Sequence, residues 1–452
     1  MAGKLYIETY GCQMNVSDTE VIFSILGKEG YQRTASMEEA DVILANTCSV
    51  RDNAEQRIWG RIELFHKQKQ IRKDVIVGIV GCMAERLKDK LIETGKVDLV
   101  AGPDSYRSLP RLLRDIAPDK PQIDVLLSHE ETYADIVPVR TDRAGVSAFI
   151  SIMRGCNNVC SYCVVPYTRG AERSRDPETI VAEARDVFAK GYREVTLLGQ
   201  NVDSYHWKCP ENSVTFPELL EMVARISPEL RVRFATNHPK DISDALIETM
   251  ARYGNICRHI HLPVQSGSNR LLEKMRRRYT REWFLERVAR IREILPDCCI
   301  TTDVIAGFPG ETDEEHAQTM AFVGSIPFAG GHIFPYSPRP GTGAARMSGQ
   351  VPKAVQKERA KQLRDLFEQK TEQFETSFIG STRQVLWEST QQLPDGQWET
   401  HGLSENYLTV KTIFPTPVRN RIDSVRISGR QDGKLIGIVI PDPGKEDNDG
   451  RI

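Results

Sequence analysis

The chain lacks the features that would place it in a membrane or give it a strong charge of one sign. Its 452 residues contain no run of about 18 apolar residues, so no membrane-spanning helix is predicted. The net charge of −2 excludes a polyanion-binding surface spread over the whole protein, so any nucleic-acid site needs a local basic patch. The first residues, MAGKLYIETYGC, lack the apolar core of a signal peptide. We therefore expect a cytoplasmic protein with no membrane partner.

The composition is otherwise ordinary, and the cysteines are its most informative feature. Hydrophobic residues make up 40% and charged residues 27% of the chain, as in a typical globular protein, and the length allows two to four domains. There are ten cysteines. In a cytoplasmic protein disulfides are rare, and clustered cysteines more often bind metal or react.

The first 128 residues alternate strand and helix signals. Apolar runs such as ADVILANT and DVIVGIVG are typical of strands buried in a parallel sheet, and each is followed by a helical pattern. This order predicts an α/β domain with a doubly wound parallel sheet. The helix after the first strand is expected to begin with a capping box formed by Ser17 and Glu20. Residues 129–146 form a polar stretch that we interpret as a linker.

A second alternating series occupies residues 147–376. Its six strand candidates are AFISIM, EVTLLG, RVRFAT, HIHLPV, CITTDVIAG and GGHIFPYS. Six βα units are fewer than the eight of a closed barrel, so a partial (βα)6 barrel, open on one side, is predicted. After a charged helix, residues 377–443 carry short alternating strands that indicate a small antiparallel β-barrel. Residues 444–452 are expected to be disordered.

Three cysteines lie within eight residues in the stretch RGCNNVCSYCVVPYTRG. Cys156, Cys160 and Cys163 have the spacing C-x3-C-x2-C and follow the first barrel strand, at the end of the barrel where active sites are built. A structural zinc site needs four protein ligands, and iron–sulfur clusters normally take four cysteines. Three ligands would leave one metal position open for a guest. A structural zinc loop and chance clustering are the alternatives.

The N-terminal domain repeats this pattern with dispersed cysteines. Cys12, Cys48 and Cys82 each lie just after a predicted parallel strand and just before a helix. Neighbouring strands are about 4.8 Å apart, so residues at their carboxyl ends converge, and helix N-termini favour thiolates. These three could hold a second cluster, again without a fourth ligand; unrelated buried cysteines are the alternative. The remaining cysteines share no such context and are interpreted as buried or incidental thiols: Cys209, Cys257, Cys298 and Cys299.

The C-x3-C-x2-C spacing followed by an open βα barrel resembles the radical S-adenosylmethionine (SAM) enzymes. The motifs GCQMN at Gly11–Asn15, NTCSVRDNAEQR at Asn46–Arg57 and CSYCVVPYTRG at Cys160–Gly170 extend the resemblance over nearly the whole chain. They are similar to those of the methylthiotransferase family, and within it to the MiaB group, which modifies tRNA. A group that acts on a ribosomal protein typically has Pro-Lys after the first Gly-Cys, and a threonylcarbamoyladenosine group has Lys first. Here these residues are Gln13 and Met14.

The resemblance implies a fold and a reaction. It implies a flavodoxin-like N-terminal methylthiotransferase domain (1–128), a radical SAM domain (147–376) and a TRAM RNA-binding domain (377–443). Two [4Fe–4S] clusters are expected, an auxiliary one on Cys12, Cys48 and Cys82 and a radical SAM one on the loop cysteines. The implied reaction converts N6-isopentenyladenosine at tRNA position 37 to its 2-methylthio form. Two SAM molecules would be used per turnover, one as methyl donor and one as source of the 5′-deoxyadenosyl radical that removes the C2 hydrogen.

The resemblance also implies partners and contacts. The partners would be a tRNA anticodon stem-loop carrying isopentenyladenosine, an electron donor such as flavodoxin, and a sulfur or cluster donor. Tyr162 matches an aromatic position near the SAM adenine, although it could equally be a packing residue. Gln200 and Gln265 follow the second and fourth barrel strands, where SAM or substrate would bind, with plain loop structure as the alternative.

Local positive charge is the sequence evidence for RNA binding. We interpret four arginines near the cysteine loop as candidate RNA contacts, although such runs are usually solvated faces: Arg169, Arg173, Arg175 and Arg277. The family often has Gly-Arg-Thr in its TRAM domain, whereas this chain has Gly402, Leu403 and Ser404, which argues against a backbone contact there. Gly307 and Gly310 in AGFPGET indicate a tight turn.

Several functions remain open from the sequence. The alternatives within the enzyme class are methylthiotransferases that act on an aspartate of a small-subunit ribosomal protein or on threonylcarbamoyladenosine in tRNA. Alternatives of other classes are a non-catalytic iron–sulfur electron carrier or RNA-binding protein, and a structural zinc protein. The sequence does not indicate the reductant, the route of sulfur replenishment or the oligomeric state.

Overall fold

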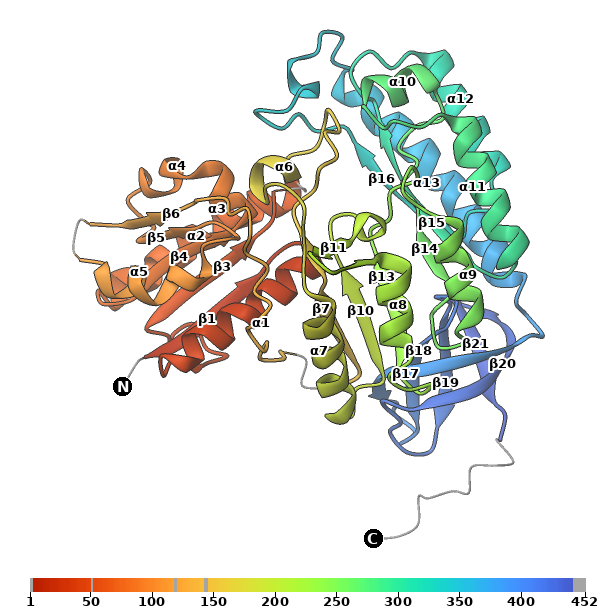
Figure 1. Cartoon of the computed structure of the whole chain (residues 1–452), viewed down its shortest axis with the longest axis horizontal. Helices are drawn as coiled ribbons and strands as arrows, with labels where there is room; N and C mark the ends of the chain where they lie inside the picture. The colour runs from red at the N-terminus through yellow and green to blue at the C-terminus, as the bar shows by residue number, and fades with distance from the viewer. Residues whose placement is uncertain (1–2, 50–51, 118–119, 142–144, 442–452) are drawn as a thin grey trace.

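The N-terminal part of the chain forms a six-stranded parallel sheet (Figure 1). The computed structural model describes residues 3–49, 52–117, 120–141 and 145–441. The strands lie in the order β2-β1-β3-β4-β5-β6, and the first five follow the order of the flavodoxin-like fold. The strand bounds are β1 Lys4–Thr9, β2 Gln32–Arg33, β3 Val42–Thr47, β4 Ile76–Gly81, β5 Leu99–Ala101 and β6 Gln122–Asp124.

Helices cover both faces of this sheet. Alternate residues of each strand point to opposite faces, where they belong to two separate apolar clusters. Leu44 and Val80 pack with α1 and α5 on one face, whereas Ile43 and Ile79 pack with α2 and α3 on the other. This arrangement confirms the predicted doubly wound sheet. The helices are α1 Gln13–Lys28, α2 Asp52–Ile71, α3 Cys82–Leu87, α4 Asp89–Ile92, the 3-10 turn η1 Tyr106–Ser108 and α5 Leu109–Asp115.

The start of α1 differs from the prediction. The helix begins at Gln13, with Cys12 as N-cap and Asn15 completing a capping box, so the Ser17–Glu20 prediction was wrong. Ser17 is buried inside the helix, and the Glu20 carboxylate instead accepts hydrogen bonds from Thr141 and Arg140. A cysteine can fill the cap position because a sulfur can also accept from the backbone of the first turn.

Six parallel strands form the predicted partial barrel. The first three and the last three each form a sheet, a bridge between Val232 and Ile256 joins the two, and β7 and β16 form its edges. All six strand predictions are confirmed. The strands are β7 Ser147–Ser151, β10 Glu194–Leu198, β13 Arg231–Ala235, β14 His259–His261, β15 Cys299–Ala306 and β16 Gly330–Pro335.

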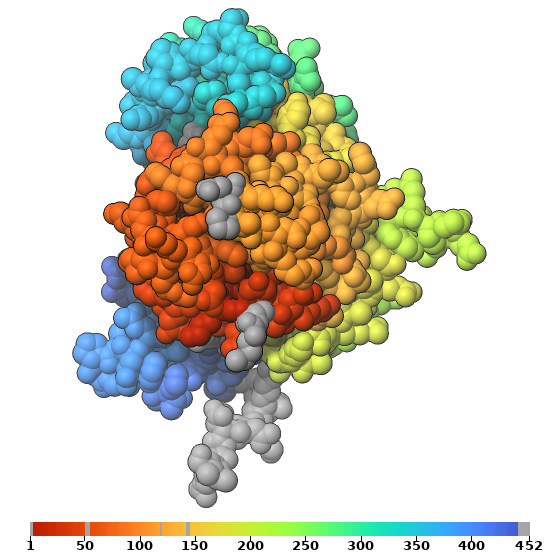
Figure 2. Space-filling model, turned by 90° about the vertical axis from the view of Figure 1, so that its left-hand side faces the viewer, coloured from red at the N-terminus to blue at the C-terminus, as the bar shows by residue number. Residues whose placement is uncertain are grey.

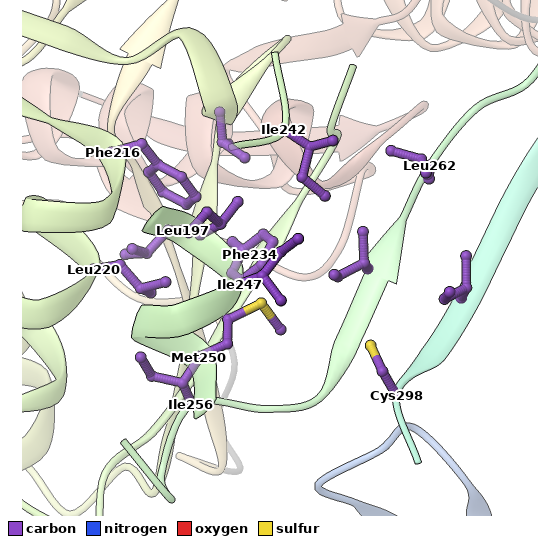
Figure 3. Packing of buried hydrophobic residues seen from close by; sticks show 14 of the residues in the cluster. Leu197, Phe216, Leu220, Phe234, Ile242, Ile247, Met250, Ile256, Leu262 and Cys298 are labelled. Carbon is purple, nitrogen blue, oxygen red and sulfur yellow. The ribbon is translucent and has the colours of Figure 1, made fainter. Parts of the chain in front are cut away.

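The outward side chains of these strands pack on a layer of helices, as in Figure 3, where Leu197 and Phe234 meet Phe216, Leu220 and Ile247. The helices are α7 Pro177–Ala189, α8 Phe216–Ala224, α9 Asp244–Arg252, α10 Asn269–Lys274, α11 Arg281–Ile294, α12 Asp313–Ser325 and α13 Lys353–Thr376. The connections carry short elements: β8 Met153–Arg154, α6 Val165–Thr168, β9 Arg173–Ser174, η2 Val202–Ser204, β11 His206–Cys209, β12 Asn212–Thr215 and η3 Ala344–Arg346.

The C-terminal strands close into a five-stranded barrel around Trp387. Four neighbouring pairs are antiparallel, as predicted, but β19 and β21 pair in parallel. An odd number of strands makes this necessary, because directions that alternate around a closed ring of five must repeat once. The strands are β17 Thr382–Gln392, β18 Trp398–Ser404, β19 Thr409–Phe414, β20 Ile422–Gln431 and β21 Lys434–Val439. The predicted disordered tail, 444–452, lies outside the described residues.

The two outer parts contact different sides of the central barrel. The small barrel lies under the amino ends of its strands, where Arg231 and Arg233 donate hydrogen bonds to the carbonyl oxygens of Leu403 and Ser404. The N-terminal part packs through α1 against β7 and fills the face shown in Figure 2, in red and orange. Within the described ranges, every helix is too short or too polar to cross a membrane.

Candidate functional site

The three dispersed cysteines lie at the carboxyl ends of the neighbouring strands β1, β3 and β4, as predicted. Gly11 makes the close approach possible, because it has a φ of +132° and a Cβ there would lie 2.5 Å from the Cys48 Cβ. Cys48 and Cys82 are buried, whereas Cys12 is exposed. The trio is therefore open on the Cys12 side.

The surroundings of this trio favour the thiolate form of Cys12. The hydrogen bond with Cys48 is the main cause that lowers the pKa of Cys12 to about 6, and the positive charge of Arg169 lowers it further. Burial raises the pKa of Cys82, and the same Arg169 charge opposes that rise. An arginine from the central domain thus acts electrostatically on cysteines of the N-terminal domain.

The second trio lies in the loop after β8. The Cys156 amide donates to the Gly170 carbonyl at 3.2 Å, and the Asn158 amide points at the Cys156 sulfur at 3.4 Å. Burial and then the negative charge of Cys160 raise the pKa of Cys163 to about 12. Three crowded thiols of this kind cannot all ionise unless a positive group binds among them.

These donor sets fit an iron–sulfur cluster better than a single ion. None of the ten cysteines, all in the described part of the chain, forms a disulfide, and thiolates are the ligands that iron–sulfur clusters take. Among the described residues, no three His, Cys, Asp or Glu side chains converge on one point as a lone metal ion requires. A cluster of four irons binds each cysteine through a different iron, so its sulfurs need not converge.

Arg277 supports the cysteine loop from the opposite wall. Its guanidinium donates to the Cys160 sulfur at 3.4 Å, to the Tyr162 hydroxyl at 3.3 Å and to the Pro263 carbonyl at 3.0 Å. Tyr162 packs beside a small apolar cluster that includes Phe308. The loop is therefore fixed by a buried cation that touches a candidate ligand.

Segments adjoining the two trios pack against each other at the domain interface. Helix α3, which begins at Cys82, packs against α6, which follows Cys163. Beside this contact, Asp18 of α1 accepts from Arg154 at 2.8 Å and from Arg169 at 2.7 Å, all in the interior. Buried ion pairs thus join the N-terminal domain to the cysteine loop.

The arginine pattern was misread from the sequence. Arg169, Arg173, Arg175 and Arg277 are each at most 6% exposed, so they do not form the expected basic surface patch. Three of them form buried ion pairs: Arg169 with Asp18 at 2.7 Å, Arg173 with Asp104 at 3.0 Å, and Arg175 with Glu183. A run of positive charge in the sequence does not reveal burial when the carboxylate partners lie far away along the chain.

The barrel lumen carries polar residues that the sequence analysis missed. His261 donates or accepts at Thr301 Oγ1 at 3.0 Å and lies 3.4 Å from Asp303, whose Oδ1 is buried without a partner. The two predicted glutamines lie near the same end of the barrel; Gln200 has a buried unpartnered Oε1, and Gln265 has a φ of +68°. The alternation of polar residues along HIH and TTD would have indicated this lumen.

A pocket of about 880 Å³ opens beside the cysteine loop. Val159, next to Cys160, is 46% exposed there, and Arg276 and Arg278 flank the buried Arg277 with φ values of +58° and +59°. The left-handed backbone at both positions turns the two neighbours outward while Arg277 points inward. The exposed positive charge near the loop therefore comes from Arg276 and Arg278. Gly307 and Gly310, with φ of +73° and +78°, confirm the predicted tight turn.

Solved structures with the same architecture are radical enzymes that use SAM. The chain is similar to the radical SAM methyltransferase TsrM of Kitasatospora setae, with a TM-score of 0.55, 15% identity and coverage of 76% of this chain and 77% of that one. It is also similar to the cobalamin-dependent SAM radical enzyme OxsB, with a TM-score of 0.53, 12% identity and coverage of 82% and 56%. At these identities the likeness shows the fold alone.

The sequence comparisons define the class and then the family. Residues 150–323 match the radical SAM superfamily, and residues 4–102 match "Uncharacterized protein family UPF0004". With the cysteine loop at the barrel mouth, these features define a radical SAM enzyme, a class that uses SAM and a [4Fe–4S] cluster. Two curated relatives, both called tRNA-2-methylthio-N(6)-dimethylallyladenosine synthase, are each 51% identical. The Amoebophilus asiaticus protein covers 96% of this chain and 92% of its own length, and the Bacteroides thetaiotaomicron protein covers 85% of each. The chain belongs to this family of tRNA methylthiotransferases.

Proposed function

We propose that this chain converts N6-dimethylallyladenosine (isopentenyladenosine) at position 37 of tRNA to its 2-methylthio derivative. The observation that carries the proposal is that helices adjoining the two cysteine trios pack together at one domain interface, in a chain 51% identical to synthases named for this product. Two neighbouring sites, each short of one ligand, suit a reaction that must both generate a radical and hold a sulfur. An aromatic C–H offers no acidic proton, so an acid–base pair would not suffice.

The six cysteines divide into two ligand sets in this proposal. Cys156, Cys160 and Cys163 hold the radical SAM cluster, and Cys12, Cys48 and Cys82 hold an auxiliary [4Fe–4S] cluster. When bound, these groups and two SAM molecules supply the electron, the 5′-deoxyadenosyl radical, the sulfur and the methyl group of the reaction. Tyr162, Gln200 and Gln265 are the side chains that we propose as SAM contacts.

The remaining residues of the site hold the cysteine loop, the N-terminal domain and the RNA in position. Arg277 fixes the loop through Cys160 and Tyr162, and the buried pairs of Asp18 hold the N-terminal domain against it. Arg276 and Arg278 offer exposed charge to the phosphates of an anticodon loop next to the site. The target base must leave its stack to reach a site at the barrel mouth.

The partners follow from this chemistry. The tRNA anticodon stem-loop carrying isopentenyladenosine is the substrate, an electron donor such as flavodoxin reduces the loop cluster, and a sulfur or cluster donor restores the auxiliary one. Residues 377–443 act as a TRAM domain that binds the RNA.

The test is product analysis on the anaerobically reconstituted full chain. With SAM, a reductant and isopentenylated tRNA, nuclease digestion and mass spectrometry should show 2-methylthio-isopentenyladenosine together with 5′-deoxyadenosine. Cys156→Ala should abolish both products. Cys48→Ala should leave 5′-deoxyadenosine formation largely intact and end methylthiolation, which matches the separate roles of the two trios.

Three outcomes would contradict the proposal. Methylthiolation of a ribosomal protein but not of tRNA would assign the chain to the methylthiotransferases that act on that protein. Zinc without iron or sulfide in the purified protein would indicate a structural metal site. Methylthiolated tRNA from the Cys48→Ala variant would exclude a required auxiliary cluster at the dispersed cysteines.

A further inference from the structure

Few aromatic side chains of this protein are exposed. In the part of the chain that the structure describes they are Tyr167, Tyr407 and Trp283, at 61%, 42% and 38% exposure. The Tyr407 ring stacks on His259 with 4.1 Å between centroids, and the Arg287 guanidinium lies 4.9 Å from the centre of the Trp283 ring. Over the same described residues, no ring or cation contact of this kind involves Tyr167. The most exposed aromatic ring is thus also the one without a partner.

The backbone that carries Tyr167 is held on both sides. Helix α6 begins two residues after Cys163, and the Tyr167 amide donates to the Val164 carbonyl at 2.9 Å. Directly after the helix, the buried Arg169 donates to Asp18 of α1 at 2.7 Å. The ring is therefore presented from a fixed position, and a partner that covers it does not have to order a flexible loop first.

Tyr167 lies at the boundary between the segments that carry the two cysteine trios. Helix α6, yellow in Figure 1, packs against α3, the helix that begins at Cys82, where the N-terminal part meets the barrel. The same cysteine loop exposes Val159, which lines the pocket of about 880 Å³ together with Arg276 and Arg278. An exposed ring combined with exposed positive charge is the surface that holds single-stranded nucleic acid.

The proposed reaction creates a base that needs such a ring. Unpaired bases of an RNA loop stack on one another, and the target base must leave this stack to be modified. Each neighbouring base then loses its contact on one face. An aromatic side chain at the mouth of the site can replace the lost neighbour.

We propose that Tyr167 stacks on a base next to the extruded target nucleotide of the anticodon loop. The ligand class is a single-stranded RNA base, held by its π face rather than by its hydrogen-bonding edge. This inference rests on the proposed function, because it takes a tRNA loop as the substrate. It gives the cysteine loop a second role, which is to hold the RNA as well as the candidate cluster ligands.

The experiment uses the reconstituted full chain and isopentenylated tRNA that carries 2-aminopurine at position 36 in one substrate and at position 38 in another. The fluorescence of 2-aminopurine is low when the base is stacked and rises when it loses a neighbour. With the unmodified chain, stacking on Tyr167 should keep the fluorescence low at one of the two positions. Tyr167→Leu should raise it there about twofold or more and weaken tRNA binding about 5- to 150-fold, because one base loses its platform.

Aromatic replacements separate stacking from a structural role of the side chain. Tyr167→Phe and Tyr167→Trp should keep the fluorescence low and bind tRNA within about twofold of the unmodified chain, since both retain a π face. Tyr167→Leu should not change the dependence of log Kd on log salt, because stacking releases no counter-ions. Trp283→Leu, at an exposed aromatic of α11, is the control and should match the unmodified chain.

Three results would contradict the inference. Unchanged fluorescence in the Tyr167→Leu variant would show that no base stacks on the ring, and slower reduction of the loop cluster by flavodoxin would then assign the ring to a protein partner. Equal losses of tRNA binding in the Leu, Phe and Trp variants would indicate a structural role. In each case methylthiolated tRNA from the unmodified chain would leave the proposed function intact. Absence of both tRNA binding and that product in the unmodified chain would overturn both.

Discussion

At the residue scale, neighbours in the sequence can have opposite environments. Arg277 is 4% exposed and contacts the cysteine loop, whereas Arg276 and Arg278 line the open pocket beside it. The three follow one another in the sequence, where only Arg277 was interpreted as a candidate RNA contact. Burial separates them into a residue that supports the loop and two residues that can meet a ligand.

The substitution Arg277→Gln should therefore destabilise the folded structure of the cysteine loop. The shorter amide cannot reach all three acceptors, so the Tyr162 hydroxyl and the Cys160 sulfur lose their buried donor, whereas the Pro263 carbonyl still accepts from the Tyr279 hydroxyl. Each unsatisfied buried group costs about 1–3 kcal/mol. We expect SAM cleavage without tRNA to fall at least about 10-fold, measured as 5′-deoxyadenosine formed under reduction.

Arg276→Gln is the adjacent control. Its side chain is exposed, so SAM cleavage should stay within about twofold of the unmodified chain while tRNA binding weakens. Equal loss of SAM cleavage in both variants would show that the loop does not depend on the buried guanidinium.

A buried carboxyl predicts a pH dependence of stability. Burial raises the pKa of Glu85 in α3 from 4.5 to about 7, partly opposed by Lys88. Between about pH 4.5 and 7 the folded chain keeps a proton that the unfolded chain releases, so the free energy of unfolding falls as the pH rises through this window. Glu85→Gln removes this slope and should be more stable than the original at pH 8 by about 1–2 kcal/mol.

Chemical denaturation at pH 5, 6, 7 and 8 measures this difference. Glu130→Gln, at an exposed position, serves as the control and should leave the slope unchanged. A Glu85→Gln variant whose unfolding free energy keeps the original slope would contradict the assignment.

A single residue could be placed from the sequence where a local pattern sets its position, but not where distant partners do. The positions of the dispersed cysteines in the fold could be predicted from the sequence because Cys12, Cys48 and Cys82 each follow a strand, and the loop trio could be recognised by its spacing; both are set by local pattern alone. Arg169 and Arg173 were misplaced because their partners, Asp18 and Asp104, are at least 69 residues away in the sequence. Only the fold brings such charges together.

At the scale of elements, a buried ion pair joins segments that the sequence suggested were merely linked. Arg140, in the polar stretch between the first two domains, donates to Glu20 of α1 at 2.9 Å and to Glu183 of α7 at 2.6 Å. Nearby, Tyr133 and Ile136 are buried in the core of the N-terminal sheet. The assignment of 129–146 as a linker stays a prediction, but Tyr133, Ile136 and Arg140 anchor this segment to its neighbours.

Arg140→Ala should loosen this junction. It leaves Glu20 without a cation in the interior, whereas Glu183 keeps its pair with Arg175; removing one partner of a buried pair costs about 3–5 kcal/mol. We expect lower resistance to denaturant and faster proteolysis within residues 129–146. Arg114→Ala is the control, because its pair with Glu29 is exposed and worth at most about 1 kcal/mol.

At the scale of the whole molecule, strand patterns predicted all three parts but not how they contact one another. The small barrel lies at the amino ends of the central strands, and the cysteine loop lies at their carboxyl ends. With three to eight residues per strand at about 3.3 Å each, the separation is about 10–26 Å. The Gly402–Leu403–Ser404 segment, which departs from the family motif, faces the central barrel through Arg231 and Arg233. Domain contacts of this kind depend on a few specific pairs that no periodicity reveals.

This separation predicts how the C-terminal barrel contributes to activity. An RNA that reaches the cysteine loop while contacting this barrel must extend along the side of the molecule, so the barrel can add affinity without touching the reacting base. Arg419→Glu and Arg426→Glu, at exposed positions of the barrel, should each weaken tRNA binding about 10-fold and reduce the dependence of log Kd on log salt by about one. SAM cleavage without tRNA should not change.

Binding measured at several salt concentrations, together with 5′-deoxyadenosine formation, tests this separation of roles. Arg185→Glu, on the exposed face of α7, controls for the change in net charge. If the barrel variants bound tRNA as the unmodified chain does, the RNA would have to be held by the loop side alone. If they lost SAM cleavage without tRNA, the barrel would act on the distant loop through the structure, because its arginines are about one strand length or more from the cysteines.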